Sequence, residues 1–173
     1  MARLRPAKAY RRLKRAYTRK SKFRQKSYVK GVPSPRIVLF DVGDKTRTFP
    51  CTVNLISRKE IQIRENALES ARLTANRYLE LNLGKAGYGL KIRVIPHHIL
   101  RENPLSTGAG SDRLQTGMSL SFGKPIGAAA QIHKGQTLFV VGVEEKDIPI
   151  ALEAMRKATK KLPMHCSIET KKA

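Results

Sequence analysis

Segments with an apolar residue at every second position recur along the chain and predict β-strands. Residues 36–42 and 48–56 are rich in β-branched residues and are separated by the turn-forming segment 43–45, so we expect them to form a β-hairpin. Pro50 cannot donate a ladder hydrogen bond, which should place the second strand of this hairpin at a sheet edge or a bulge.

Further strand patterns follow in the second half of the chain. Residues 88–95 alternate apolar with basic or small residues, which predicts a half-buried strand that exposes Lys91 and Arg93 and ends before Pro96. The other predicted strands lie at 129–132, 137–143 and 165–168, the first two separated by a turn at 133–136.

Two segments repeat apolar residues at the spacing of an amphipathic helix. The first covers residues 64–83, with Gly84 as its stop and a capping box formed by residues 57–60 at its start. The second should begin after Asp147, which acts as its capping residue, and end at Pro163, which cannot continue a helix.

Together these elements predict an α+β fold in which two helices pack on one face of a mainly antiparallel sheet. Residues 31–173 should form this single domain, and a Gly-Val-Pro-Ser-Pro break at 31–35 separates it from an N-terminal extension, residues 1–30. The stretch 102–128 is rich in glycine and lacks periodicity, which predicts a long irregular loop whose part at about 102–112 is mobile.

Charge distinguishes the extension from the rest of the chain. The 173 residues contain 35 Lys and Arg against 13 Asp and Glu, a net charge of +22, and the first acidic residue is Asp41. Residues 1–30 combine many like charges with few apolar side chains, so they should gain a shape only on a polyanion. Aromatic rings that suit stacking on unpaired bases lie among these cations, at Tyr10, Tyr17, Phe23 and Tyr28.

The distribution of charge favours a nucleic acid over a membrane as the partner. The extension lacks the apolar face of a membrane-binding helix, and the chain has no run of 18 apolar residues and no signal-like start. Cys51 and Cys166 are far apart in the sequence, which fits a reducing cytoplasm and argues against a disulfide framework. We therefore expect a cytoplasmic RNA-binding protein with no membrane partner.

Motifs that would indicate an enzyme are incomplete. Residues 117–124 have five residues between the glycines where a P-loop has four, and Pro125 occupies the place of the P-loop Ser or Thr. Arg113 stands where a dinucleotide-binding fingerprint needs its third glycine. The four histidines lack the spacing of metal ligands, and no nucleophile has a base partner. We expect no enzyme activity, no cofactor and no metal.

Three passages carry a family resemblance. They are residues 5–11 (Arg-Pro-Ala-Lys-Ala-Tyr-Arg) with residues 31–33 (Gly-Val-Pro), residues 67–72 (Ala-Leu-Glu-Ser-Ala-Arg), and residues 108–127, which contain Gly-Ala-Gly-Ser-Asp-Arg-Leu-Gln-Thr-Gly-Met and Phe-Gly-Lys-Pro-Ile-Gly. With them the sequence resembles the archaeal and eukaryotic ribosomal protein family L-ten-e, the counterpart of bacterial L-sixteen. The similarity extends from about Arg5 to Ile168, nearly the whole chain.

The resemblance implies a hammerhead-type α+β fold in the large ribosomal subunit. Its partners would be the large rRNA near the 5S rRNA and the aminoacyl-tRNA cleft, together with neighbouring ribosomal proteins. A loop is also implied to face the acceptor arm of tRNA, and its residues here are Ser106, Thr107, Gly108, Ala109, Gly110, Ser111 and Asp112.

Charge pattern and resemblance together nominate the residues that contact rRNA. In the extension they are Arg3, Arg5, Lys8, Tyr10, Arg11, Arg12, Lys14, Arg15, Arg19, Lys20, Lys22, Arg24 and Lys26. In the body they are Arg93, His97, Arg113, Lys124 and Lys134. We expect a structural constituent of the large ribosomal subunit. The alternatives are a nucleotide-dependent RNA-modifying enzyme that uses residues 108–127 and an architectural DNA-binding protein.

Overall fold

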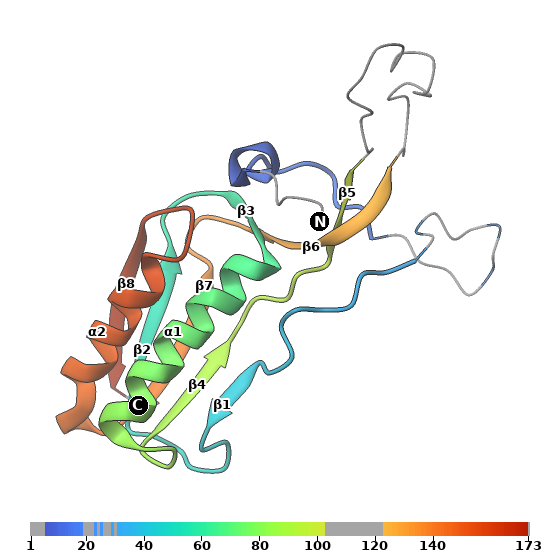
Figure 1. Ribbon diagram of the computed structural model, residues 1–173. Helices are drawn as coiled ribbons and strands as arrows, with labels where there is room; N and C mark the ends of the chain where they lie inside the picture. The colour runs from blue at the N-terminus through green and yellow to red at the C-terminus, as the bar shows by residue number, and fades with distance from the viewer. Residues whose placement is uncertain are drawn as a thin grey trace.

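The chain folds into two antiparallel β-sheets and two α-helices (Figure 1). This computed structural model describes residues 6–18, 23, 25, 29, 31–102 and 123–172. The strands are β1 (Asp41–Gly43), β2 (Cys51–Ser57), β3 (Ile61–Arg64), β4 (Tyr88–Ile92), β5 (His98–Glu102), β6 (Lys124–Ile132), β7 (Thr137–Val143) and β8 (Cys166–Lys172). The helices are α1 (Glu65–Leu83) and α2 (Ile148–Thr159), with short 3-10 turns η1 (Ala7–Tyr10) and η4 (Glu145–Asp147).

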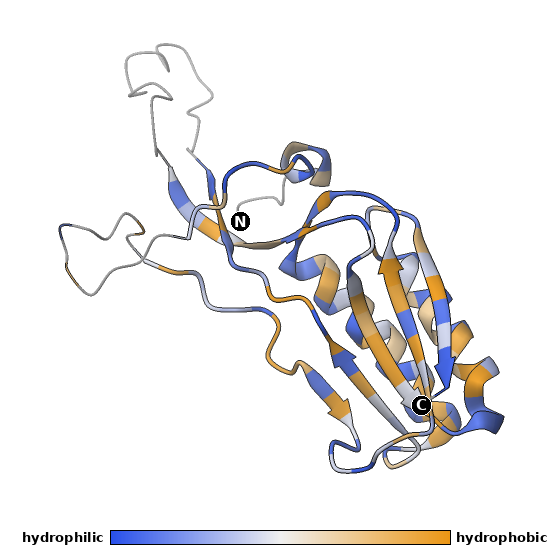
Figure 2. Ribbon diagram, turned by 180° about the vertical axis from the view of Figure 1, so that it is seen from behind, coloured by the Kyte–Doolittle hydropathy of each residue, from blue (hydrophilic) through white to orange (hydrophobic). Residues whose placement is uncertain are grey.

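The larger sheet has the strand order β1-β4-β7-β2-β8, and all its neighbouring strands are antiparallel. Both α-helices cover one face of this sheet, and within the described part of the chain no helix covers the other face (Figure 2). The alternation of burial along β2 explains this layering, because every second residue is buried and those between are half-buried. The predicted α+β class, antiparallel pairing and two helices on one face are confirmed.

The hydrophobic core lies between the helices and the larger sheet. Its helical residues recur every three or four positions: Leu68, Ala71, Ala75 and Leu79 in α1, and Ala151, Ala154, Met155 and Ala158 in α2. All eight are completely buried, and most are alanines. Small side chains let the two helices approach each other and the sheet closely, which explains how a chain without Trp packs a continuous core.

The smaller sheet has the order β3-β6-β5 and is bordered by residues 6–18, which we name the strap. At the outer edge of β3, the backbone N–H of Gln62 donates to the carbonyl of Arg11 at 3.0 Å. At the outer edge of β5, the backbone N–H of Ile99 donates to the carbonyl of Tyr17 at 3.1 Å. The strap therefore bonds both edge strands, which occupies N–H groups that would otherwise be open to pairing.

The predicted hairpin of residues 36–42 and 48–56 is wrong. β1 pairs with β4, whereas β2 lies between β7 and β8, so the two segments are not neighbours in the sheet. The segment between β1 and β2 has to pass β4 and β7, and Phe49 lies against Gly89 and Gly142 of those strands on the way. Pro50 immediately precedes an inner strand, where it occupies no ladder position, rather than an edge or a bulge.

The strands of the smaller sheet were predicted less completely than those of the larger sheet. β4, β7 and β8 are found where strands were predicted, but β3 and β5 were not predicted. β6 begins at Lys124, inside the predicted irregular stretch 102–128, because its run of glycine and alanine gives no alternation to detect. Of the predicted mobile loop at about 102–112, only residue 102 is described, and it ends β5.

Both predicted helices exist, with changes at their ends. The capping box at residues 57–60 is wrong, because Ser57 ends β2 and β3 comes between it and α1. Gly84 does stop α1: its φ is +69° and its N–H donates to the carbonyl of Glu80. Asp147 precedes α2 but makes no side-chain capping bond, and α2 ends at Thr159 instead of reaching Pro163.

Candidate nucleic-acid interface

The helix-free face of the larger sheet, named the open face, carries two basic residues, Lys91 of β4 and Arg93 just after it. Lys91 of β4 lies opposite Asp41 of β1 and Val140 of β7, and Val140 lies opposite Asn54 of β2. Lys91 and Arg93 are exposed, whereas the residues immediately before and after each of them are buried. Ile95, beyond the end of the strand, is exposed. The predicted exposure of both cations is confirmed.

A shallow hollow on this face has a volume of about 510 Å³. It is lined by Asn54, Lys91, Arg93, Gln136, Thr137 and Val140. The ammonium of Lys91 lies 3.4 Å from the carboxylate of Asp41, so its charge is partly balanced. Arg93 forms no ion pair within the described part of the chain, so its guanidinium remains available to an anion.

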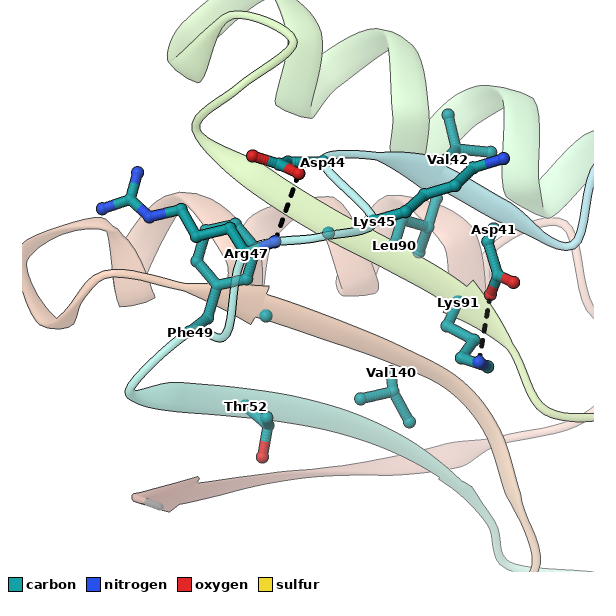
Figure 3. Close-up of a pocket in the computed structure, with 12 residues that line it drawn as sticks. Asp41, Val42, Asp44, Lys45, Arg47, Phe49, Thr52, Leu90, Lys91 and Val140 are labelled. Carbon is teal, nitrogen blue, oxygen red and sulfur yellow. Dashed lines mark hydrogen bonds and ion pairs between the residues drawn. The ribbon is translucent and has the colours of Figure 1, made fainter.

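A second hollow of about 260 Å³ adjoins the first and contains an aromatic ring laid flat against two strands (Figure 3). The ring of Phe49 rests on Gly89 and Gly142, where a Cβ atom would lie 3.1 Å and 2.8 Å from ring carbons of Phe49. The guanidinium of Arg47 lies over this ring, 5.4 Å from its centre. Glycine at both strand positions is therefore what admits the ring to the face.

A tight turn at Asp44 fixes the backbone that presents Arg47. The carboxylate of Asp44 accepts hydrogen bonds from the backbone N–H and hydroxyl of Thr46, each 2.9 Å, and from the backbone N–H of Arg47 at 3.3 Å. These bonds stabilise the carboxylate, so the pKa of Asp44 lies below its usual value. The side chain of Arg47 also pairs with Glu144, which orients it across Phe49.

The strap forms a second basic surface, on the smaller sheet. The side-chain amide of Gln62 donates to the carbonyl of Tyr10 at 2.9 Å, and that of Gln131 donates to the carbonyl of Lys14 at 2.5 Å. The backbone N–H of Tyr17 donates to Nδ1 of His98 at 2.7 Å. Residues of the strap that carry charge are exposed: Lys8, Arg11, Arg12, Lys14 and Arg15.

The tyrosines of the strap were expected to offer their rings to RNA bases. In the structure both rings contact basic side chains of the smaller sheet. The guanidinium of Arg101 lies 3.8 Å from the centre of the Tyr17 ring, and that of Arg64 lies 5.6 Å from the centre of the Tyr10 ring. Both tyrosines are half-buried, so they hold the strap by cation–π contacts with the body.

Comparison with known proteins places this geometry in a family. The family described as ribosomal protein L16p/L10e matches residues 13–169. The chain belongs to the ribosomal protein L16p/L10e family. Large ribosomal subunit protein uL16 of Methanococcus maripaludis is 46% identical over 166 residues, which cover 95% of this chain and 92% of that protein. The protein of the same name from Archaeoglobus fulgidus is 44% identical over 167 residues, 96% of this chain and 92% of that protein.

Membership of the L16p/L10e family agrees with the expectation from the incomplete motifs that the chain is not an enzyme. Burial raises the pKa of the Cys166 thiol to about 11, so this thiol is protonated at neutral pH. In the described ranges no three His, Cys, Asp or Glu side chains gather as metal ligands. Among the same residues no helix has both the length and the apolar character needed to cross a bilayer.

The predicted rRNA contacts of this L16p/L10e protein fall on separate parts of the fold. Five cations and Tyr10 lie on the strap, and Arg93 lies on the open face. His97 is exposed between β4 and β5, Lys124 starts β6, and Lys134 is exposed in the turn between β6 and β7. Residues outside the described part of the chain are Arg3, Arg5, Arg19, Lys20, Lys22, Arg24, Lys26, Arg113 and the loop Ser106–Asp112.

Four residues that shape these surfaces were not predicted. Arg47 and Phe49 read as parts of a hairpin, and the signal that could have found them is the glycine at an inner position of both β4 and β7. Gln62 and Gln131 face each other across β3 and β6, and their role depends on contacts with a strap about 50 and 117 residues away in sequence. No local pattern reports contacts over such distances.

Proposed function

We propose that this protein is a structural constituent of the large ribosomal subunit in the cytoplasm, where it binds rRNA through the strap and the open face. The observation that carries the proposal is the family match over residues 13–169, which includes the open face and the second half of the strap, residues 13–18. Relatives that share 44–46% of their residues with this chain are named large ribosomal subunit protein uL16. A net charge of +22 also favours a polyanionic partner.

The two surfaces are suited to phosphate in different ways. On the strap, exposed Arg and Lys side chains stand on an immobilised backbone and can each neutralise a phosphate. On the open face, Arg93 and Lys91 flank a shallow hollow, and Arg47 lies over an aromatic ring beside it. The hollow is shallow, so it cannot bury most of a small ligand's surface, whereas a ribose-phosphate backbone can lie across it.

The finer placement within the subunit is part of the same proposal. The resemblance supports contacts with the large rRNA near the 5S rRNA and the aminoacyl-tRNA cleft, with neighbouring ribosomal proteins as further partners. It also supports a role for the loop Ser106–Asp112 beside the acceptor arm of tRNA. This loop has no acidic residue except Asp112, which suits an RNA environment.

Sedimentation of cell extracts tests the assignment to the subunit. The protein should migrate with large subunits and remain on them in moderate salt, because many contacts must break together. The isolated protein should instead lose rRNA affinity steeply as salt rises. Recovery of most of the protein in ribosome-free fractions would refute the assignment.

Crosslinking tests the finer placement. A photoreactive group introduced at Ser106 or Ser111 in intact large subunits should link to rRNA lining the tRNA cleft, and bound tRNA should compete with the link. The matched control carries the same group at Leu81, an exposed residue of α1 on the helical side of the fold. Links from Ser106 only to RNA remote from that cleft would contradict the placement.

A further inference from the structure

Two glutamines of the smaller sheet hold the strap by hydrogen bonds that do not involve the strap's cationic side chains. Gln62 and Gln131 are partners in the register between β3 and β6, and their carboxamides contact each other at 3.3 Å. Each donates its side-chain N–H to a carbonyl of the strap, at Tyr10 and at Lys14. We name this pair the glutamine clamp.

The strap crosses the smaller sheet strand by strand. It is bonded at Arg11 to the outer edge of β3, at Lys14 to Gln131 of the central strand β6, and at Tyr17 to the outer edge of β5. These bonds are to strap backbone groups, to its carbonyls and to the N–H of Tyr17. The backbone is therefore fixed at three successive points.

The apolar and aromatic side chains of the strap differ from its cationic side chains in how deeply they are buried. Tyr10, Leu13 and Tyr17 are half-buried, whereas the cations between them are exposed. The strap has no acidic residue of its own, and Arg64 and Arg101 of the sheet lie beneath its tyrosines. A cationic segment on a cationic support repels itself, so neutral hydrogen bonds must oppose that repulsion.

Carboxamides suit this task better than carboxylates. A glutamate in place of either glutamine could pair with a strap cation, but it would remove that cation from the surface and would weaken phosphate binding there. A glutamine side chain donates to the backbone, adds no charge, and is half-buried or buried, as Gln131 and Gln62 are. The arrangement holds the segment while all its cations face outward.

We propose that the glutamine clamp pre-orders the strap, so that residues 8–15 form a cationic ribbon ready to bind an RNA backbone. This inference rests on the proposed function and adds its positioning residues, Gln62 and Gln131. A segment that is already ordered loses less conformational entropy on binding, so the same phosphate contacts give a higher affinity. The strap then differs from a tail that takes its shape on the partner.

Binding of the full-length protein to deproteinised large-subunit rRNA tests the inference. In the double variant Gln62→Ala, Gln131→Ala, the affinity should fall about tenfold, the order expected for two lost hydrogen bonds. The slope of log affinity against log salt should stay unchanged, because the number of cations is the same. Without RNA, the backbone amides of Tyr17 and Ile99 should exchange hydrogen faster than in the wild type.

Two controls separate this inference from the proposed function. Asn82→Ala removes a similar bond, from a side-chain carboxamide to the carbonyl of Tyr78 in α1, and should change neither affinity nor exchange at the strap. Lys14→Ala with Arg15→Ala removes two exposed cations and should make the salt slope shallower by about 1.5 to 2. Where the double variant unfolds more easily, Gln131→Ala alone is used, with an expected loss of about threefold.

The outcomes are distinct. If wild-type affinity for rRNA does not depend on salt, the proposed function fails. If the wild type binds with a steep salt slope and the clamp variant matches it in affinity, the clamp does not pre-order the strap for RNA. The inference is equally overturned if the affinity falls while exchange at Tyr17 and Ile99 remains slow, because the strap would then still be in place.

Discussion

The two sheets of this protein are held by different kinds of interaction. The larger sheet packs against α1 and α2 through completely buried side chains such as Val53, Leu55 and Phe139. The smaller sheet contributes few residues to that core and is bordered instead by the strap, through backbone and glutamine hydrogen bonds. Hydrophobic burial thus secures the larger sheet, whereas the smaller sheet combines a few core residues, such as Ile63 and Ile132, with polar contacts to the strap.

This difference has a consequence for binding. The larger sheet can expose cations on its open face because the opposite face supplies the stability. The smaller sheet exposes cations on a segment whose place depends on a few hydrogen bonds, each of which contributes only about 1 kcal/mol. We therefore expect substitutions in the core of the larger sheet to change stability. Substitutions in the contacts that hold the strap should change RNA affinity with little change in stability.

Truncation in the core should have the largest effect. Phe139 is completely buried between the larger sheet and the helices, so Phe139→Ala should lower the free energy of unfolding by about 3 to 5 kcal/mol. Urea denaturation measures this change. The control Leu81→Ala, at a residue that is 77% exposed, should change it by less than about 0.5 kcal/mol. Equal effects of the two substitutions would contradict the description of the core.

Crowding the open face should have an intermediate effect. Gly142→Ala places a methyl group 2.8 Å from the Phe49 ring, which should cost about 1 to 3 kcal/mol of stability and displace the Arg47 side chain above it. In a Phe49→Ala background the same substitution should cost much less. A double-mutant cycle by urea denaturation measures this coupling, and strictly additive effects would show that Gly142 does not support the ring.

Acidification should affect the strap rather than the core. Burial and then the charge of Arg101 lower the pKa of His98, and neutral Nδ1 accepts the N–H of Tyr17. Since the folded pKa lies below the ordinary value of 6.5, this contribution is complete above about pH 6.5 and is lost as pH falls through the folded pKa. Hydrogen exchange at Tyr17 should accelerate on acidification after correction for intrinsic rates, and His98→Gln should reduce that pH dependence.

The smallest expected effect concerns the reactivity of the two thiols in the folded protein. Both cysteines lie in the larger sheet, so their reactivity reports on that sheet alone. Cys51 is only 2% exposed, and the thiol of Cys166 has a pKa of about 11 because of burial. Both should react slowly with an aromatic disulfide reagent at pH 7, and both should react rapidly after unfolding in urea. Rapid labelling of Cys166 in the folded protein would show that the edge strand β8 separates readily from β2.

The same division explains what could be predicted from the sequence. The helices and β2 and β4 have periodic apolar patterns, because one side of each packs on the core, and β7 is a nearly continuous apolar run. β3 is only four residues long and the middle of β6 is a run of one glycine and three alanines, so neither has a strong pattern. The hairpin error arose because Phe49 interacts with Gly89 and Gly142 across the sheet, and local turn composition does not report such a contact.

The candidate site divides in the same way. Exposed cations such as Arg93 and Arg15 were predicted, since charge and alternation are visible in the sequence. The glutamine clamp was not, because Gln62 and Gln131 acquire their role only when three distant segments meet. The position of the strap tyrosines was also missed, because aromatic residues among cations suit both RNA bases and the protein's own arginines.

The exposed strap cations are proposed to neutralise rRNA phosphates. The most direct measurement is the salt dependence of rRNA affinity for the wild type and for a variant with Arg11, Arg12, Lys14 and Arg15 replaced by Gln. The slope of log affinity against log salt should become shallower by about 3 to 4 in the variant, one unit or slightly less for each lost contact. An unchanged slope would contradict this proposal.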